Sequence, residues 1–439
     1  MSLAADLIIH PRWLIPVDPA NRVLDHYSLV VRAGIILDIL PQDEARRRYH
    51  APEVFELPGR ALIPGMVNLH AHAAMSLMRG LADDLPLARW LEDVIWPTER
   101  KHMSPGFVRD GALLAAREML RGGITTCNDM YFFPAASAEA FSTAGMRAIV
   151  GLLVIGFPSA WANDLDDYLR RGLVVRDQWQ GHPRIGFALA PHAPYSVADA
   201  GLERVAILAA EMNLPIHIHV HETIGEIDDA LASSGMRPLA RLERLGLLGP
   251  TLTAVHTVHV NETDLALLAH HGCNVAHCPT SNMKLASGIM PLAAMLDRAI
   301  NIGLGTDGAA SNNRLDLFQE MRHAALLAKV TGNDASAAPA RAMLRMATLG
   351  GARALGLEHV IGSLEIGKHA DLCAVDLNDP LVTPCFDPVS HLVHACGREQ
   401  VTHVWVGGEI RVNDKHVMLQ IDDNELLARA SLWQTKLVS

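Results

Sequence analysis

Clustered positive charge is missing from this chain of 439 residues. Its 37 Lys and Arg against 48 Asp and Glu give a formal net charge of −11, and the densest basic stretch is the short Arg46-Arg47-Arg48. Binding to nucleic acid or to an anionic membrane surface rests on clustered positive charge. We therefore expect neither a nucleic acid nor a membrane as a partner.

Long apolar runs, a secretory leader and paired cysteines are missing as well. The longest apolar run, residues 148–157, is far shorter than the ~18 residues that a membrane-spanning helix needs. The N-terminus, MSLAADLIIHPRW, has no basic start followed by an apolar stretch, so no secretory signal is expected. Six Cys residues are spread along the chain without a CxxC pair, which is unlike a disulfide framework and predicts a cytoplasmic location.

Aromatic residues are scarce too, at 5% of a chain that is 50% hydrophobic, so aliphatic side chains dominate the expected core. Short apolar runs alternate with longer segments of helical period through the middle of the chain. These runs begin at eight places: Leu62, Gly123, Arg147, Arg184, Leu214, Leu252, Cys273 and Ile300. Eight apolar strands alternating with helices predict an α/β protein with a (β/α)₈ TIM barrel.

The two ends of the chain have a different pattern. Residues 1–60 and 362–439 contain short β-like runs broken by Pro, Gly and Asp, and the final DDNELLARASLWQTKL has a helical period. Neither end alone has enough strands to bury an apolar face. We therefore expect one composite β-sandwich domain from residues 1–60 and 362–439, with a C-terminal helix, around a catalytic barrel of residues 61–361.

Histidine is abundant, with 23 residues, more than Phe and Trp together. His70 and His72 are two residues apart at the end of the first expected barrel strand, so both side chains face the barrel interior. Catalytic groups of such barrels lie at the C-terminal ends of the strands. Chance spacing is the alternative reading of an HxH in a chain this rich in His. The strand-end position favours a metal site.

The segment PIHIHVHET places three more His on one face of a later strand. Spacing alone leaves open which of His217, His219 and His221 reaches a metal. Glu222 follows at the strand end, where its carboxylate could transfer protons or merely cap a helix. His192 and His256 end two other strands.

Asp307, in LGTDGAASNN, ends the eighth strand and is either a metal ligand or part of an Asp-Gly turn. Three His and one carboxylate suit Zn²⁺ better than Mg²⁺ or Ca²⁺, and Fe²⁺ is an open alternative. Related two-metal barrels hold both ions with a carboxylated Lys after the fourth strand. Because the chain has no Lys between Lys101 and Lys284, we expect one metal ion per subunit.

Five segments together resemble the amidohydrolase superfamily: PGMVNLHAHAAMSLMRG, APHAPYS, HIHVHET, HCPTSNMKL and LGTDGAASNN. Within it they are most similar to the branch of 5′-methylthioadenosine/S-adenosylhomocysteine deaminases, which is related to triazine chlorohydrolases and guanine deaminases. The resemblance covers essentially the whole chain. It implies a barrel with a β-sandwich from both chain ends, and the metal-dependent hydrolytic deamination of a purine nucleoside.

The resemblance also implies roles for individual residues. It makes His70, His72, His219 and Asp307 the metal ligands, with Asp307 also acting in catalysis. It makes Glu222 the group that moves protons to and from the substrate, and His256 the group that orients the attacking water. Substrate contacts are implied for Trp90, Glu99, His192, Glu222 and Ser311. For Trp90, packing of a lid helix on the barrel is the alternative, and His221 departs from the family pattern.

The prediction of the exact substrate rests on the segment after the third strand. Family members that accept S-adenosylhomocysteine have an Arg after the third strand, and this chain has none between Arg147 and Arg170. A buried carboxylate without a partner is costly, so we expect 5′-methylthioadenosine or adenosine to be preferred. Alternatives are hydrolysis of another amino-heterocycle, as in triazine chlorohydrolases or guanine deaminases, and a non-catalytic metal-binding scaffold. Assembly into a homo-oligomer stays open.

Overall fold

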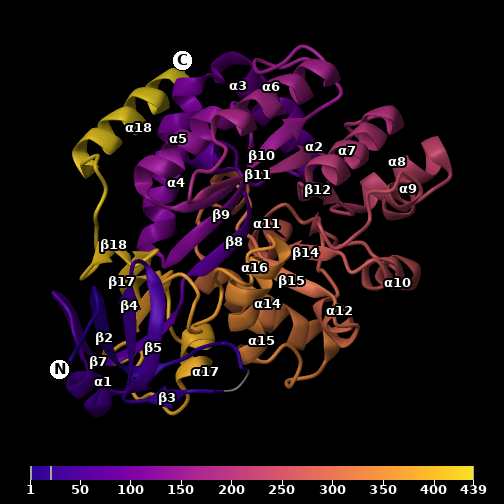
Figure 1. The fold of residues 1–439 in the computed structure, drawn as a ribbon. Coiled ribbons are helices and arrows are strands. Elements are labelled where there is room, and N and C mark those ends of the chain that lie inside the picture. Colours follow the sequence, from indigo (N-terminus) through magenta and orange to yellow (C-terminus); the bar gives the residue numbers. More distant parts are fainter. Residues whose placement is uncertain (1, 20–21, 439) are drawn as a thin grey trace.

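An eight-stranded parallel sheet forms the centre of the molecule, as a computed structural model of the chain shows for residues 2–19 and 22–438 (Figure 1). The strand order follows the sequence, from β8 to β15. The amide of Asp307, just after β15, donates to the carbonyl of His70 on β8 across 3.0 Å, which joins the two ends of the sheet. The predicted TIM barrel is confirmed. Its strands are β8 Met66–Ala71, β9 Ile124–Tyr131, β10 Arg147–Val154, β11 Ile185–Pro191, β12 Ile216–Val220, β13 Leu252–His256, β14 Asn274–His277 and β15 Asn301–Leu304.

Helices surround this barrel and bury the outer face of the strands, which explains why the strands are apolar along nearly their whole length. In α4 the side chain of Ser104 accepts the amide of Phe107, Pro105 occupies the first turn, and Gly122 follows the last one. The principal helices after the barrel strands are α4 Pro105–Arg121, α5 Pro134–Ala144, α6 Leu165–Gln178, α7 Asp199–Met212, α8 Ile224–Ser234, α9 Pro238–Arg244, α10 Glu262–His270, α11 Pro279–Lys284, α12 Leu292–Asp297, α13 Ala309–Asn312, α14 Leu317–Gly332, α15 Ala340–Arg345 and α16 Gly351–Ala354.

The two chain ends pair in a second sheet, as predicted. Strand β7 lies antiparallel to β16, with Ile63 opposite Cys373, so the N-terminal and C-terminal segments meet at the middle of this sheet. β7 continues as far as Pro64, directly before the barrel begins. The sheet runs β19 His416–Val417, β18 Glu409–Asn413, β17 Val401–Val406, β16 Leu372–Asp376, β7 Glu53–Pro64, β2 Leu7–Leu14, β4 Tyr27–Arg32 and β5 Ile35–Pro41, with β3 Leu24–Asp25 on β2.

The C-terminal helix α18, Asp423–Leu437, leaves this sheet and lies along α4 on the outside of the barrel (Figure 1). The indole of Trp433 donates to Asp110 Oδ2 across 2.9 Å, and its ring meets the ring of Phe107 edge to face. Helix α18 also contacts α3, Trp96–His102. The end of the chain therefore supports the segment that precedes α4.

That segment covers the barrel opening and is called the lid here, residues 87–102. It consists of three consecutive helical pieces: α2 Leu87–Arg89, the π-helical turn Trp90–Ile95, and α3. Its apolar residues pack together with α4 and with the end of β9. The lid thus places a helix across the end of the barrel where the strand termini lie.

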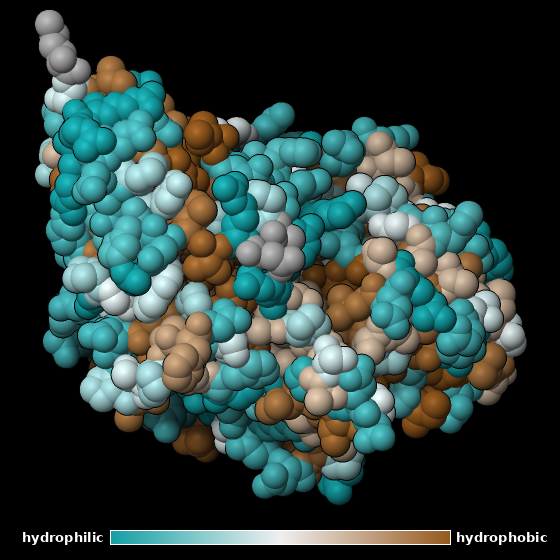
Figure 2. Space-filling model, turned by 90° about the horizontal axis from the view of Figure 1, so that it is seen from below, coloured by the Kyte–Doolittle hydropathy of each residue, from teal (hydrophilic) through white to brown (hydrophobic). Residues whose placement is uncertain are grey.

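No helix in residues 2–19 and 22–438 is both long and apolar enough to cross a membrane. Hydrophilic residues cover most of the face shown in Figure 2, and hydrophobic residues are scattered among them.

Candidate metal centre and active site

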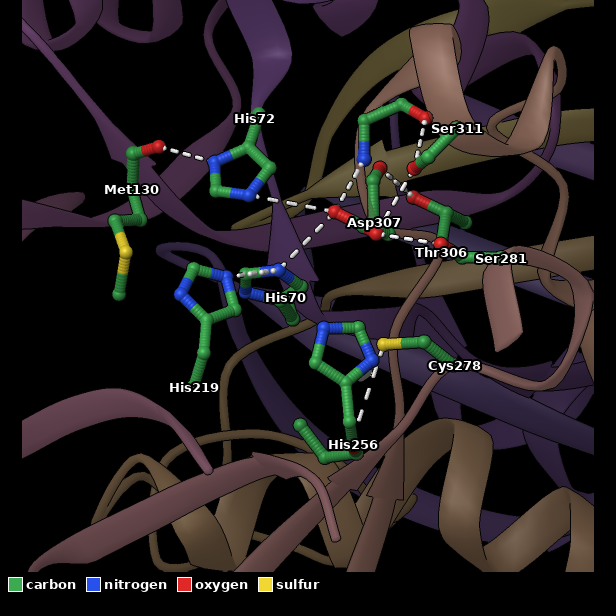
Figure 3. Close-up of polar contacts among 12 residues, drawn as sticks. His70, His72, Met130, His219, His256, Cys278, Ser281, Thr306, Asp307 and Ser311 are labelled. Atoms are coloured by element: carbon green, nitrogen blue, oxygen red, sulfur yellow. Dashed lines mark hydrogen bonds and ion pairs between the residues drawn. The ribbon is translucent and has the colours of Figure 1, made fainter. Parts of the chain in front are cut away.

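Four side chains from different parts of the barrel converge at its C-terminal end (Figure 3). His70 lies near the end of β8 and His72 directly follows it, His219 lies on β12, and Asp307 follows β15. Asp307 Oδ1 lies 3.2 Å from His70 Nε2 and 3.3 Å from His72 Nε2. His219 Nε2 lies 3.2 Å from His70 Nε2. The chain therefore gathers three imidazole nitrogens and one carboxylate oxygen around one point.

Each of the three imidazoles is held through its other nitrogen. His72 Nδ1 donates to the carbonyl of Met130 across 2.6 Å, and His219 Nδ1 donates to the carbonyl of His192 across 2.7 Å. His70 Nδ1 lies 2.9 Å from His217 Nε2. A carbonyl can only accept, so His72 and His219 each carry a proton on Nδ1, and the Nε2 atom of the neutral ring is the one that can bind a metal.

If the proton of His70 is on Nδ1 as well, three Nε2 lone pairs and a carboxylate oxygen lie together without a proton between them. Burial is the main reason that the pKa of His70 falls to about 4, so its ring is neutral at pH 7. Burial alone would raise the pKa of Asp307, but the contact with His70 and the neighbouring imidazoles hold it well below its ordinary value. Lone pairs this close repel one another unless a cation lies among them. The donor set and its geometry therefore fit a divalent metal ion.

Glu222 and His256 lie beside these four side chains. Glu222 follows β12, and burial raises the pKa of its carboxyl group. His256 ends β13, with Nε2 3.8 Å from Glu222 Oε2 and Nδ1 2.9 Å from Oδ1 of Asn282. Nδ1 donates to Asn282, and Nε2 faces the carboxyl group of Glu222. A proton-binding carboxyl group and an oriented imidazole thus stand next to the metal donors.

A cavity of about 530 Å³ opens above this group and reaches the lid. Most of the predicted site residues line it: His72, Trp90, Glu99, His192, His219, Glu222, His256 and Asp307. Its other walls are largely apolar and come from the lid and from the segment after β10. His70 is fully buried beneath the cavity floor.

On the lid, Glu99 is buried and accepts a hydrogen bond from the phenol of Tyr131. Burial raises the pKa of Glu99 to about 7, although this hydrogen bond opposes the rise. Trp90 is buried and its indole nitrogen has no hydrogen-bond partner among the described residues. His192 faces the cavity, and burial lowers its pKa to about 3.

Ser311 occupies a different place from the other predicted substrate contacts. It is buried outside the cavity lining, and its hydroxyl donates to Asp307 Oδ2 across 2.9 Å. Ser281 donates to the same oxygen across 2.6 Å. Two hydroxyl groups therefore fix one oxygen of Asp307, and the other oxygen is directed at the imidazoles (Figure 3).

Three residues at strand ends have left-handed backbone. The φ angles are 58° at His221, 70° at His256 and 61° at Asp307. Non-glycine residues rarely adopt this conformation, which costs on the order of 1–3 kcal/mol per residue. It turns the chain sharply where the strands end. His221 lies away from the metal donors: its Nε2 accepts the amide of Leu239, and its Nδ1 donates to the carbonyl of His259.

Several contacts of this site carry no sequence signal of their own. Ser281 and Asn282 are part of the HCPTSNMKL segment, but the segment does not indicate that one holds Asp307 and the other His256. Tyr131 ends the second barrel strand, and that position was its only indication. Arg100, on the lid next to Glu99, also lines the cavity.

Comparisons with known proteins agree with this geometry. Residues 61–411 match the amidohydrolase family. A 5-methylthioadenosine/S-adenosylhomocysteine deaminase of Saccharophagus degradans is 44% identical over 99% of this chain and 97% of its own length. A relative of the same name from Teredinibacter turnerae is 45% identical over 98% of both chains.

Solved structures are similar over the same extent. An adenosine deaminase from Xanthomonas campestris with bound zinc superposes with a TM-score of 0.98, at 45% identity over 100% of both chains. A zinc complex of the atrazine chlorohydrolase TrzN from Arthrobacter aurescens, at 24% identity over 98% of this chain and 100% of its own, has a TM-score of 0.90 and shares the fold. The match over most of the chain, together with the barrel and its four converging donors, shows that this protein belongs to the amidohydrolase family.

Proposed function

We propose that this protein is a metal-dependent deaminase that converts an adenine nucleoside into its inosine analogue and ammonia. Candidate substrates are 5′-methylthioadenosine, adenosine and S-adenosylhomocysteine. The observation that carries the proposal is the position of Glu222 and His256 beside the metal donors, at the floor of a cavity whose lid presents Glu99. The names of the relatives and of the Xanthomonas campestris structure support the same reaction.

The metal proposal is one Zn²⁺ per subunit, held by His70, His72, His219 and Asp307. Three nitrogens and one oxygen suit zinc, and the Xanthomonas campestris structure contains zinc. Strand β11, the fourth of the barrel, ends at Pro191 and is followed by His192, so no Lys is available there to bridge a second ion. A bound divalent metal supplies a water that is nucleophilic at neutral pH. Metal analysis of purified protein distinguishes one zinc from two and from iron.

The reaction adds water to C6 of the adenine ring and breaks the bond between C6 and the amino nitrogen. In our proposal Glu222 takes a proton from the water and delivers it to N1 of the ring, which prevents charge from building up there. Asp307 accepts the second proton of the water, which then converts the amino group into ammonia. His256 orients the attacking oxygen, and His192 contacts the substrate. Trp90 packs on the nucleoside, and Glu99 accepts hydrogen bonds from the ribose hydroxyls.

Ser311 has a modified role in this proposal. Because it donates to Asp307 and lies outside the cavity lining, we propose that it acts through Asp307 and does not touch the substrate. Glu99 favours a nucleoside over a triazine or guanine, since in this proposal it binds a sugar, which neither of those compounds has.

The test is ammonia release by zinc-loaded protein from adenosine, 5′-methylthioadenosine, S-adenosylhomocysteine, guanine and an amino-triazine. We expect release from an adenine nucleoside, and a loss of 10²–10⁴-fold in the Glu222→Gln variant. That variant keeps the size of the side chain and removes its proton-transfer capacity. Release from guanine or the triazine alone would replace the proposal by another amidohydrolase reaction, and release from none would favour a non-catalytic scaffold.

Two further proposals concern organisation. We propose that residues 1–60 and 362–439 form one domain and residues 61–361 another, which the pairing of β7 with β16 supports. We also propose a cytoplasmic location, which is supported by the six cysteines, all of them free thiols.

A further inference from the structure

The HIHVH segment of β12 carries one more histidine than the metal site uses on this strand. His219 is one of the four converging donors, and His217 lies two residues earlier on the same face, one layer deeper in the barrel. His217 is 1% exposed. Its Nε2 lies 2.9 Å from Nδ1 of His70, and the two rings meet nearly at right angles.

The direction of this hydrogen bond follows from the rest of the site. His70 presents Nε2 to Asp307 and His219, so its proton must be on Nδ1 if Nε2 is to bind a metal. Nδ1 then donates, and His217 Nε2 accepts. The proton of His217 is consequently on its own Nδ1, which is buried without a hydrogen-bond partner among the described residues. His217 thus makes one hydrogen bond and leaves another unmade.

The hydrogen bonds that hold the three imidazoles differ in their acceptors. His72 and His219 are held by main-chain carbonyls of Met130 and His192, which every side-chain substitution leaves in place. His70 is held by a side chain. Of these three acceptors, His217 is therefore the one that a side-chain substitution can remove.

We propose that His217 is a positioning residue of the metal centre, which fixes the tautomer and ring orientation of His70 by accepting its Nδ1 proton. The inference rests on the proposed metal site, but not on the identity of the substrate. Partners of this kind on a metal ligand typically affect metal affinity by 10–100-fold. The alternative is that His217 only fills the barrel core.

The two readings differ in what they predict for zinc affinity. If His217 only fills the core, an apolar side chain of similar volume keeps zinc affinity, as the same change at His277 does. If His217 positions His70, zinc affinity falls when the acceptor is removed and is kept when an amide oxygen replaces it, because the buried Nδ1–H of His70 then has a partner again.

The test compares three variants. His217→Leu removes the acceptor, and His217→Gln retains an acceptor at the same reach. His277→Leu is the matched control, because His277 on β14 is equally buried, also has an unpartnered Nδ1, and forms no hydrogen bond to a metal donor among the described residues. Zinc affinity is measured by competition with a chelator, and the Tm is measured on the metal-free proteins.

We expect His217→Leu to bind zinc 10–100-fold more weakly, and His217→Gln and His277→Leu to stay within a few-fold of the unmodified protein. The apoprotein Tm shows that each variant is folded. Unchanged zinc affinity in His217→Leu, or an equal loss in His217→Gln or His277→Leu, would overturn the inference. If the Leu variant does not fold, His217→Met answers the same question. A protein that shows the expected affinities but releases no ammonia would leave His217 in this role and overturn only the proposed reaction.

Discussion

Tyr131, at the end of β9, donates its phenolic hydrogen to Glu99 Oε1 on the lid, with 2.7 Å between the two oxygens. Both side chains are buried, and burial raises the pKa of each. This contact joins the lid to the second barrel strand directly above the metal donors. A ligand that hydrogen-bonds to Glu99 therefore meets a carboxyl group that the barrel already holds in place.

Replacement of Glu99 tests whether this group binds a sugar. For Glu99→Ala we expect the KM for adenosine, measured above pH 7 where the carboxyl group of Glu99 is ionised, to rise by about 10–100-fold, since hydrogen bonds to a charged group contribute about 1.5–3 kcal/mol. Tyr131→Phe keeps the carboxyl group and removes its partner, so its KM should rise less. Steady-state kinetics measures both. An unchanged KM in Glu99→Ala would indicate a substrate without ribose.

Arg100 is the one Lys or Arg of the described residues that line the cavity. The cavity wall at the end of β10 and just after it is apolar, with Leu153, Ile155 and Phe157. Arg100 is exposed, and burying the carboxylate of S-adenosylhomocysteine without a partner is costly. We therefore expect kcat/KM to be higher for 5′-methylthioadenosine and adenosine than for S-adenosylhomocysteine.

Arg100→Ala should lower kcat/KM for S-adenosylhomocysteine further and leave 5′-methylthioadenosine unchanged. Arg89→Ala is the matched control, because Arg89 also lies on the lid but pairs with Asp93 and does not line the cavity. A clear lead for S-adenosylhomocysteine in the unmodified protein would contradict this prediction.

The hydroxyls of Ser281 and Ser311 should act as a pair on Asp307. Each donates to Oδ2, so either Ala variant leaves one hydrogen bond, and the double variant leaves none from these two residues. We expect kcat/KM to fall by several-fold in each single variant and by about 100-fold in the double variant, the range typical of groups that hold metal ligands. Zinc affinity should fall in parallel. Ser234→Ala, on the exposed face of α8, serves as the control.

Glu320 should make stability depend on pH. It is fully buried on α14, where its carboxyl group accepts the amide of Thr280 and the side chain of Asn312, and burial raises its pKa to about 8. The folded chain therefore keeps a proton that the unfolded chain releases above the ordinary value of 4.5. Stability from this group is full below about pH 4.5, falls as the pH rises to about 8, and is constant above that.

Glu320→Gln cannot ionise and removes this dependence. The stability of the variant relative to the unmodified protein should rise between pH 5 and pH 8, by an amount of the order of a few kcal/mol. Urea unfolding at several pH values measures the difference. Parallel profiles would show that Glu320 does not titrate in this range.

Sequence reasoning worked best where chemistry coincides with strand ends. His70, His72, His219, His256 and Asp307 each follow or end an apolar run, and parallel strands of a barrel bring such ends together. The pairing of the chain ends was predictable for a related reason, since each end alone has too few strands to bury an apolar face.

The depth of each side chain in the barrel, and its contacts with neighbouring elements, were not predictable from the sequence. A period of two places His217, His219 and His221 on one face, but it does not state which layer of the barrel each reaches, and only folding in three dimensions separates them. Ser311 illustrates the same limit. A position four residues after Asp307 is compatible with either a substrate contact or a hydrogen bond to Asp307, and the sequence does not distinguish the two. The contact between Tyr131 and Glu99 joins residues 32 positions apart, which no local pattern encodes.

Because helix α18 is translated after the barrel, the order of synthesis sets the point at which the lid gains its support. The last barrel strand ends at Leu304, but the partner of β7 is first translated at residues 372–376, and the support for α3 and α4 arrives only with residues 423–437. The lid that carries Glu99 therefore gains its outer support only after residues 423–437 have been translated.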